Sequence, residues 1–351
     1  MARSRNRFGT KATPAGMGYS MPAEWDEHEA TWLSWPKNPL TFPPELMGQV
    51  EKTYAIMVGV LREGEEVRVL VDDAAGEKHA RARLGSPRNV SFVRLKTADV
   101  WTRDYAPVYV RGKDVALTKW SFNAWGGKYD DLKPDDAAGM KLARESGSRV
   151  FETGMVLEGG SVDVNGKGTL ITTEQCLLNQ NRNPGLSRRA LEYRLRANLG
   201  ARHVVWLGSG ISGDDTDGHV DDVARFVAPD VILLGWEGDP SDPNHSPLKD
   251  NLRRLRESTD QDGEIFDIIT VPMPTPVTSP EGRLPASHLN FYIGNSAVLV
   301  PTFGSPTDDN AVGTLKGCFP GRKVVGIDCR ALVYGLGTLH CVTQQVPAAR
   351  R

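Results

Sequence analysis

The sequence contains few cysteines and no long apolar run, and each of these absences excludes a class of protein. Four cysteines occur among 351 residues, at Cys176, Cys318, Cys329 and Cys341. That number is too small for a scaffold held together by disulfides. No two of them have the Cys-x-x-Cys spacing of a zinc knuckle,. Because no run of about 20 apolar residues is present, the sequence predicts no membrane-spanning helix and no membrane partner.

Charge is also nearly balanced, with 42 basic and 44 acidic residues and a net charge of −2. This balance argues against nucleic acid as the main partner. The basic N-terminal segment, which contains Arg3 and Arg5, is not followed by the apolar stretch of a secretion signal,. We therefore expect residues 1–20 to form a solvated tail without fixed structure, residues 21–351 to form a single domain, and the protein to be cytoplasmic.

The sequence repeats one pattern, a hairpin followed by an amphipathic helix and a strand. In the clearest copy, a hairpin is predicted over 161–173 with its turn at Asn165-Gly166,. A helix is predicted after Ser187, with Leu191, Leu195 and Leu199 on one face and Gly200 at its end,. A strand is predicted over 203–207. Similar copies are predicted over 107–152, 222–271 and 290–328. In the copy over 222–271 we expect Ser246 to cap the helix and the strand to span 265–271.

The N-terminal part adds a predicted helix over 44–62 and a strand over 67–71, which gives about five units. Polar residues recur at equivalent points of these units: Asp104, Glu158, His219, Asn290 and Cys341 are separated by 51 to 71 residues. If the units are arranged radially, these side chains meet at one axis. The pattern is typical of a propeller-like array of α/β class.

Cys341 is the candidate nucleophile, because it follows the glycines Gly335 and Gly337 in a predicted loop,. His219 and the acids Asp104, Glu158 and Asp221 lie in short polar motifs elsewhere. A thiol, an imidazole and several carboxylates are the groups needed to hydrolyse a cationic carbon centre. The alternative for Cys341 is a small buried apolar residue, as we expect for Cys176, Cys318 and Cys329.

A metal site is a second interpretation of the acidic segment 213–222. Asp215, Asp217, His219 and Asp221 alternate, so one face of a strand would present four ligands to a divalent metal,. This interpretation leaves Cys341 without a role. The cysteine hypothesis, which requires no metal and no cofactor, is therefore preferred.

Five motifs together resemble one known family, and the resemblance extends from about Met21 to Pro347. The motifs are Trp101-Thr-Arg-Asp104, Glu158-Gly-Gly-Ser161, the segment Thr172 to Pro184, Asp217-Gly-His219-Val-Asp221 and the segment His340 to Gln345. They resemble agmatine deiminase, in the bacterial branch that is similar to peptidylarginine deiminase. The resemblance implies the pentein fold, a five-fold pseudosymmetric α/β propeller. It also implies hydrolysis of agmatine to N-carbamoylputrescine and ammonia, a step of polyamine biosynthesis, through an amidino-thioether on Cys341.

Within this resemblance, Cys341 is the expected nucleophile and His219 the expected general acid and base. Glu158 is expected to orient His219, while Asp104 and Asp221 grip the guanidinium through paired hydrogen bonds. The resemblance does not fix how these roles divide among the three acids.

Three further residues are predicted near the substrate. Trp101 and Asp215 are expected at its tail, and Asn290 occupies the site position of its unit. Asp215 stands where some relatives have glutamate, a change that concerns the tail rather than the reacting carbon. His340 precedes the nucleophile, and in an extended segment its side chain would point away from that of Cys341.

The expected partner is a small cationic guanidino compound, and the oligomeric state stays open, homo-oligomers included. Free arginine and peptidyl arginine are alternative substrates with the same chemistry. A noncatalytic binding protein of the same fold is an alternative of another class. Such a binder would not need the thiol of Cys341.

Overall fold

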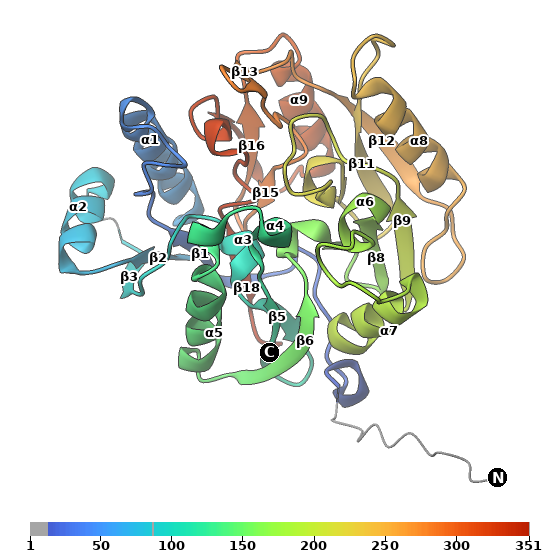
Figure 1. Ribbon diagram of the computed structural model, residues 1–351, viewed down its shortest axis with the longest axis horizontal. Helices are drawn as coiled ribbons and strands as arrows, with labels where there is room; N and C mark the ends of the chain where they lie inside the picture. The colour runs from blue at the N-terminus through green and yellow to red at the C-terminus, as the bar shows by residue number, and fades with distance from the viewer. Residues whose placement is uncertain (1–12, 86–87, 351) are drawn as a thin grey trace.

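The computed structural model describes residues 13–85 and 88–350. Repeated α/β units follow one another around the molecule, with the long helices on the outside and the sheets directed toward the middle (Figure 1). Five of the six sheets among the described residues share one strand pattern. An antiparallel pair comes first, and a strand parallel to its second member follows beyond a crossover helix.

Four of these units are continuous in sequence, as predicted. The first contains β4 (Val108–Arg111), β5 (Val115–Ser121), α5 (Asp135–Glu145) and β6 (Arg149–Val156). The second contains β7 (Asp163–Val164), β8 (Thr169–Thr173), α7 (Arg188–Leu199) and β9 (His203–Leu207). The third contains β10 (Ala224–Phe226), β11 (Val231–Trp236), α8 (His245–Arg256) and β12 (Asp267–Pro272). The fourth contains β15 (Tyr292–Ile293), β16 (Ala297–Thr302), α9 (Asp308–Cys318) and β17 (Lys323–Asp328).

The fifth unit is assembled from both ends of the chain. Its elements are β18 (Gln344–Pro347), β1 (His28–Ser34), α1 (Pro44–Leu61), β2 (Glu66–Val71), α2 (Ala74–Leu84) and β3 (Val90–Arg94). The late strand β18 pairs antiparallel with β1, and β1 pairs in parallel with β2. The predicted helix over 44–62 and strand over 67–71 are confirmed. The terminal pairing and the extension of this unit by α2 and β3 were not predicted.

Helix α7 illustrates why these elements form where they do. The Ser187 hydroxyl accepts a hydrogen bond of 3.3 Å from the backbone N–H of Ala190, which caps the first turn; such a cap contributes about 1 kcal/mol. Gly200 ends the helix in the left-handed conformation, at φ 72°,. Leu191, Leu195 and Leu199 are at most 2% exposed, because their spacing puts them on the face toward the sheet,.

Three predicted boundaries are wrong. Helix α8 begins at His245 after Asn244, so Ser246 is not its cap; the N–H of Asn244 bonds Asp242, which starts the turn earlier. The strand predicted over 265–271 is β12, which begins at Asp267, because Ile265 is 77% exposed in an isolated bridge with Thr259.

The third correction concerns the predicted tail, of which residues 1–12 lie outside the described part. Residues 13–20 are not a solvated tail, because helix η1 (Ala15–Met17) is formed there and Tyr19 is 2% exposed. The backbone of Ser20 also pairs with Arg111 in the first continuous unit.

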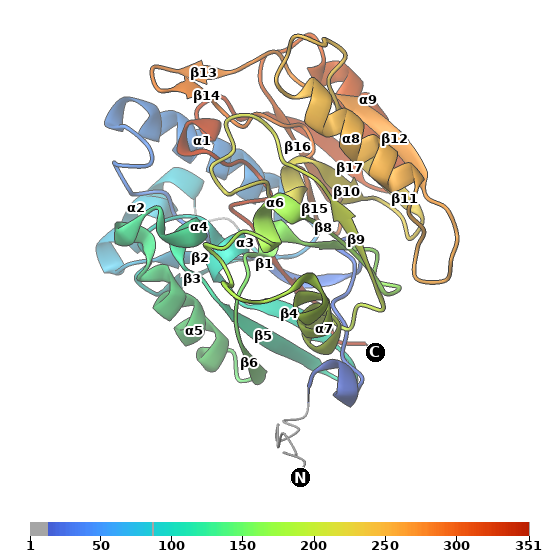
Figure 2. The ribbon, with the colours of Figure 1, turned by 45° about the vertical axis from the view of Figure 1, so that its right-hand side comes forward.

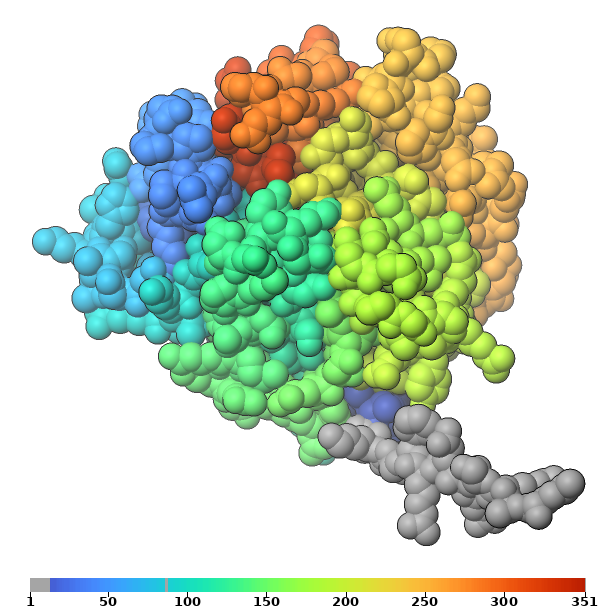
Figure 3. Space-filling model, viewed as in Figure 1, coloured from blue at the N-terminus to red at the C-terminus, as the bar shows by residue number. Residues whose placement is uncertain are grey.

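A short turn precedes the first strand of each unit, and a candidate residue lies in this turn or directly before it. These turns are α3 (Thr102–Tyr105), η3 (Gly159–Ser161), η4 (Val220–Asp222) and the tight segments around 287–290 and 339–342. Segments from widely separated parts of the chain adjoin on the face shown in Figure 3. Figure 2 shows the hairpin of β13 (Thr278–Ser279) and β14 (Gly282–Arg283) projecting from the body. No helix in the described ranges has the length and apolar content that a membrane crossing requires.

Candidate active site

A cavity of about 480 Å³ lies where the units meet. Four of the site residues predicted from the sequence line it: Cys341, Asp104, Trp101 and Asp215. Aromatic, acidic and loop residues complete the lining, among them Trp125, Tyr129, Asp131, Glu281, Arg283 and Leu336. The cavity is therefore built from segments that are far apart in sequence.

The thiol of Cys341 is 7% exposed and lies beside two polar side chains. Its Sγ accepts a hydrogen bond of 3.1 Å from Asn290 Nδ2 and is 3.8 Å from Asp221 Oδ2. Asn290 also fixes the turn, because its Oδ1 accepts from the Thr338 hydroxyl and from the backbone N–H of His340, at 2.8 and 3.0 Å. Burial raises the pKa of the Cys341 thiol well above its usual value, and Asp221 raises it further,.

The imidazole and the carboxylates converge around Gly160. A Cβ built on Gly160 would lie 2.6 Å from His219 Nδ1, 2.9 Å from Asp221 Oδ2 and 3.1 Å from Asp104 Oδ1. The ring of His219 is also 3.9 Å from Asp104 Oδ1 and, on its other side, 3.8 Å from Glu158 Oε2. Glycine at position 160 thus leaves open the point at which these groups meet.

Burial and mutual charge shift the pKa values of this cluster. Burial disfavours a charged His219, but the Asp104 carboxylate outweighs it with help from other neighbours, so the His219 pKa is well above its usual value. Burial raises the pKa of Asp104 to about 6, against the opposing effect of His219. Burial alone would raise the pKa of Glu158, yet His219 and Arg182 hold it below its usual value. At neutral pH the cluster thus contains an imidazolium between carboxylates.

Glu158 is bound on the side of His219 away from Asp104. Its Oε1 accepts a hydrogen bond of 2.7 Å from Arg182 Nε, and both side chains are fully buried. Arg182 also bonds Asp217 at 2.7 Å. Arg182 was not singled out from the sequence, although it lies within the motif from Thr172 to Pro184.

The alternating metal-ligand pattern predicted over 215–221 is wrong. Asp217 has φ 65° and turns toward Arg182, while Asp215 accepts a hydrogen bond of 2.6 Å from the Tyr129 hydroxyl. The segment is a loop rather than a strand. The four side chains therefore do not share a face.

The expectation for His340 is also wrong. Residues 339–342 form turns rather than an extended segment, so His340 and Cys341 approach the same carboxylate. His340 Nδ1 lies 2.7 Å from Asp221 Oδ2, and its Nε2 lies 2.8 Å from Glu24 Oε2. The only signal in the sequence for a role of His340 was its position next to Cys341. That signal was interpreted with the wrong backbone geometry, an extended segment instead of a turn.

Trp101 and Asp215 lie in the cavity wall. The indole N–H of Trp101 donates to Asp99 at 3.2 Å, and its ring packs edge-on against Trp125. Nothing in the sequence pattern pointed to Trp125 or Tyr129. The structure thus brings together Cys341, His219, Glu158, Asp104, Asp221 and Asn290, and places Trp101 and Asp215 around them.

A buried thiol, an imidazole and carboxylates at the meeting point of five α/β units define a hydrolase of the pentein fold that acts on guanidino groups. The chain belongs to the Porphyromonas-type peptidyl-arginine deiminase family, which it matches over residues 20–347.

Three relatives place the chain within this family. It is 38% identical to an agmatine deiminase of Pseudomonas fluorescens, over 97% of this chain and 98% of that protein. The solved agmatine deiminase of Enterococcus faecalis superposes with a TM-score of 0.90 at 32% identity, covering 96% of this chain and 98% of that one. An agmatine deiminase variant of C. jejuni with substrate bound gives a TM-score of 0.87 at 29% identity, covering 95% and 97%.

Proposed function

We propose that this protein hydrolyses agmatine to N-carbamoylputrescine and ammonia, with Cys341 as nucleophile. The observation that carries the proposal is the convergence of His219, Asp221 and Asp104 at Gly160, with the sulfur of Cys341 3.8 Å from Asp221. Relatives named agmatine deiminase over nearly the whole chain support the choice of reaction.

Asp104 and Asp221 bind the guanidinium in this proposal. Both are buried and both face the point above Gly160, so a planar cation between them receives carboxylates on two edges,. Asp221 Oδ1 has no hydrogen-bond partner among the described residues, which leaves it available to a substrate N–H. Glu158 already bonds Arg182 and faces the far side of His219, which suits an orienting role.

In the first half-reaction, the bound cation offsets the negative charges of the acids and favours loss of the Cys341 proton to solvent. The thiolate forms a bond to the guanidinium carbon. His219 donates its proton to the departing nitrogen, the C–N bond breaks, and ammonia leaves. An amidino-thioether on Cys341 remains.

In the second half-reaction, the now neutral His219 accepts a proton from water. The water oxygen bonds to the same carbon and the C–S bond then breaks. The second proton of the water passes to the departing sulfur, which releases the neutral ureido product and restores the thiol of Cys341. His219 is again an imidazolium. The cycle uses the high pKa of His219, because the group must begin each turnover protonated.

The outer cavity supports agmatine rather than arginine as substrate. Asp131, Asp215 and Glu281 line it and suit the terminal ammonium of agmatine,. Arg283 is the single cationic residue in the described lining, and its Nη1 is bonded to Asp242 at 2.7 Å. The α-carboxylate of free arginine would therefore meet acids without a free cation.

The remaining expectations belong to the same proposal. A single catalytic domain contains the described residues, 13–85 and 88–350, and the protein works in the cytoplasm, where its four free thiols stay reduced,. The oligomeric state stays open.

The test is ammonia release from agmatine, arginine and an arginyl peptide by the purified protein, with the ureido product identified by mass spectrometry. We expect kcat/KM for agmatine to exceed that for arginine by about 100-fold or more, because arginine places a carboxylate among acids. Cys341→Ser is expected to abolish turnover while still binding agmatine in a calorimeter. Equal rates for agmatine and arginine, or turnover by Cys341→Ser, would contradict the proposal.

A further inference from the structure

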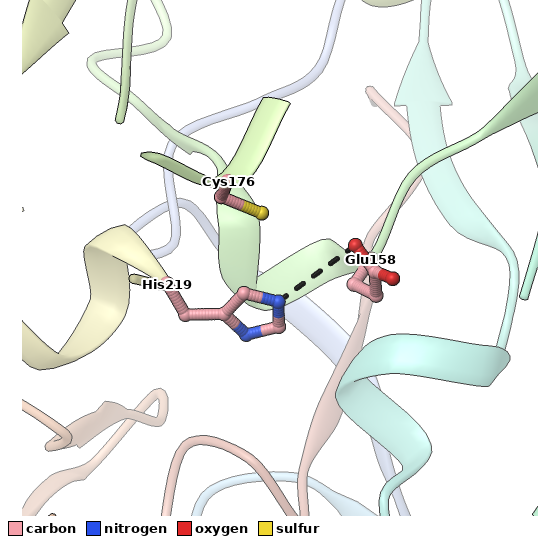
Figure 4. Close-up of side chains that lie close together, drawn as sticks. All are labelled: Glu158, Cys176 and His219. Atoms are coloured by element: carbon pink, nitrogen blue, oxygen red, sulfur yellow. Dashed lines mark ion pairs between the residues drawn. The ribbon is translucent and has the colours of Figure 1, made fainter. Parts of the chain in front are cut away.

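A third side chain lies at the face of His219 that is turned away from the cavity. Figure 4 shows the sulfur of Cys176, from α6 (Glu174–Leu177), directed toward the gap between the His219 ring and the Glu158 carboxylate. One donor atom from each of the three residues lies within 4.8 Å of the other two. All three side chains are buried, at 0 to 1% exposure.

Two of these donor atoms lack hydrogen-bond partners in the described part of the chain. Within the described residues, His219 Nε2 and Glu158 Oε2 have no hydrogen-bond partner although both are buried, and they lie 3.8 Å apart. Buried polar atoms without partners are rare in folded proteins and costly. Here both orphaned atoms adjoin the same thiol, so the gap between them can accept a ligand.

The chemistry and spacing of this set suit a borderline-soft divalent cation. Imidazole nitrogen, thiolate sulfur and carboxylate oxygen are the donors that zinc prefers, at bond lengths that put tetrahedral donors about 3.4–3.8 Å apart. We propose that Glu158, Cys176 and His219 form an inhibitory site for Zn²⁺ or a similar soft divalent ion. Three protein ligands leave the fourth position to water.

The surrounding charge favours entry of such an ion. Asp104, Asp131 and Glu281 in the cavity lining attract cations electrostatically,. Of these, Asp104 lies 3.9 Å from His219. Arg182 opposes the ion, but Asp217 bonds Arg182 at 2.7 Å and offsets its charge. Because the ligands are buried, His219 must move before the ion enters, so inhibition develops slowly and bound substrate protects.

The bound ion would disable the proton shuttle without touching Cys341. Binding releases the thiol proton of Cys176 and the Nε2 proton of His219 to solvent. A metallated imidazole keeps one nitrogen, Nδ1, which already carries its proton and cannot accept another. The loss of activity rests on the role proposed for His219, whereas metal binding itself does not.

The activity test preincubates the enzyme with Zn²⁺ and then measures ammonia release from agmatine. We expect time-dependent inhibition that EDTA reverses. Cys176→Ala and the near-isosteric Cys176→Ser should raise the Zn²⁺ concentration for half-inhibition by at least about tenfold, because even outer-shell partners are worth about 10- to 100-fold in metal affinity. Each rate is compared with the same variant's metal-free rate, and Cys318→Ala is the control thiol.

The binding test uses Co²⁺ and does not depend on catalysis. In Cys341→Ser, which lacks the nucleophile, Co²⁺ should give a near-ultraviolet thiolate-to-cobalt charge-transfer band with tetrahedral visible bands. The double variant Cys341→Ser/Cys176→Ser should lose them. Bands that persist in the double variant, Zn²⁺ inhibition that is unchanged in both Cys176 variants, or no inhibition at all would overturn the site. If agmatine is not turned over but the bands behave as expected, the proposed function fails and the metal site stands.

Discussion

At the scale of single residues, Gly160 decides whether the cluster has room for a substrate. Gly160→Ala would place a methyl group 2.6 Å from His219 Nδ1 and 2.9 Å from Asp221 Oδ2, where the guanidinium is proposed to bind. We expect kcat/KM for agmatine to fall by at least about 100-fold, the effect of displacing reacting groups by about 1 Å. Stability should fall by about 1–3 kcal/mol, the range for overpacking, because the crowded atoms belong to side chains.

Two other glycine positions provide the controls for Gly160. A Cβ at Gly159 would lie 2.2 Å from the backbone oxygen of Arg103, so Gly159→Ala should lower the melting temperature more than Gly160→Ala does. Gly313 of α9 has nothing within 4 Å, so Gly313→Ala should keep full activity and gain about 0.5–1 kcal/mol,. Native activity in Gly160→Ala would contradict this view of the cluster.

The second prediction at this scale concerns the protonation state of the Cys341 thiol. Burial, Asp221, Asp222 and Asp104 raise the pKa of its thiol, so the free enzyme holds a thiol rather than a thiolate at neutral pH. Alkylation of Cys341 by neutral iodoacetamide should be slow near pH 7 and accelerate as pH rises. Removing a carboxylate favours the anion, so Asp221→Asn should shift this profile to lower pH.

The measurement is the alkylated fraction of the Cys341 peptide by mass spectrometry, at a series of pH values. Exposed Asp309 of α9 offers a matched control, because Asp309→Asn removes the same charge from a residue that does not line the cavity. A profile in Asp221→Asn that coincides with that of the control would show that Asp221 does not govern the thiol.

At the scale of elements, local patterns predicted most of the units. The α7 helix was located because Ser187, the leucine spacing and Gly200 all act within one segment. The extension of the fifth unit by α2 and β3 was missed because α2 buries only Ala80 and thus shows no apolar face. The start of α8 was misplaced because Asp242, rather than the nearby Ser246, organises its first turn.

The same limit applies to the site elements. Asp104, Glu158, His219 and Asp221 were found because each lies in a polar motif before a predicted hairpin. Cys341 was found because it follows two glycines in a predicted loop. Glu24 and His340 were not found from the sequence, because their roles depend on a contact of 2.8 Å between opposite ends of the chain. Cys176 was correctly expected to be buried, but no local pattern places its sulfur beside His219.

At the scale of the whole molecule, the pairing of β18 with β1 joins the ends of the described chain. Removing residues 344–351 would leave the β1 edge around Trp32 without its partner Gln344 and would release the segment that holds Cys341. We expect this variant to lose cooperative thermal unfolding and all activity. Removing only residues 349–351 spares β18 and should change neither the cooperativity of unfolding nor the activity.

Circular dichroism melting and size-exclusion chromatography distinguish the two truncations. If the longer deletion kept the melting temperature of the full chain, β18 would be a peripheral strand rather than part of the fold's closure. Retained activity in that variant would also show that the turn carrying Cys341 needs no support from the sheet.

The β18–β1 pairing also has a consequence for biosynthesis. Strand β1 leaves the ribosome early, yet its antiparallel neighbour follows only after the four continuous units have been translated. A growing polypeptide therefore exposes an unpaired strand edge during most of translation, which makes it a client for chaperones that shield such edges. The segment that finally covers this edge also delivers the reactive sulfur, so an unfinished chain has no nucleophile to react prematurely.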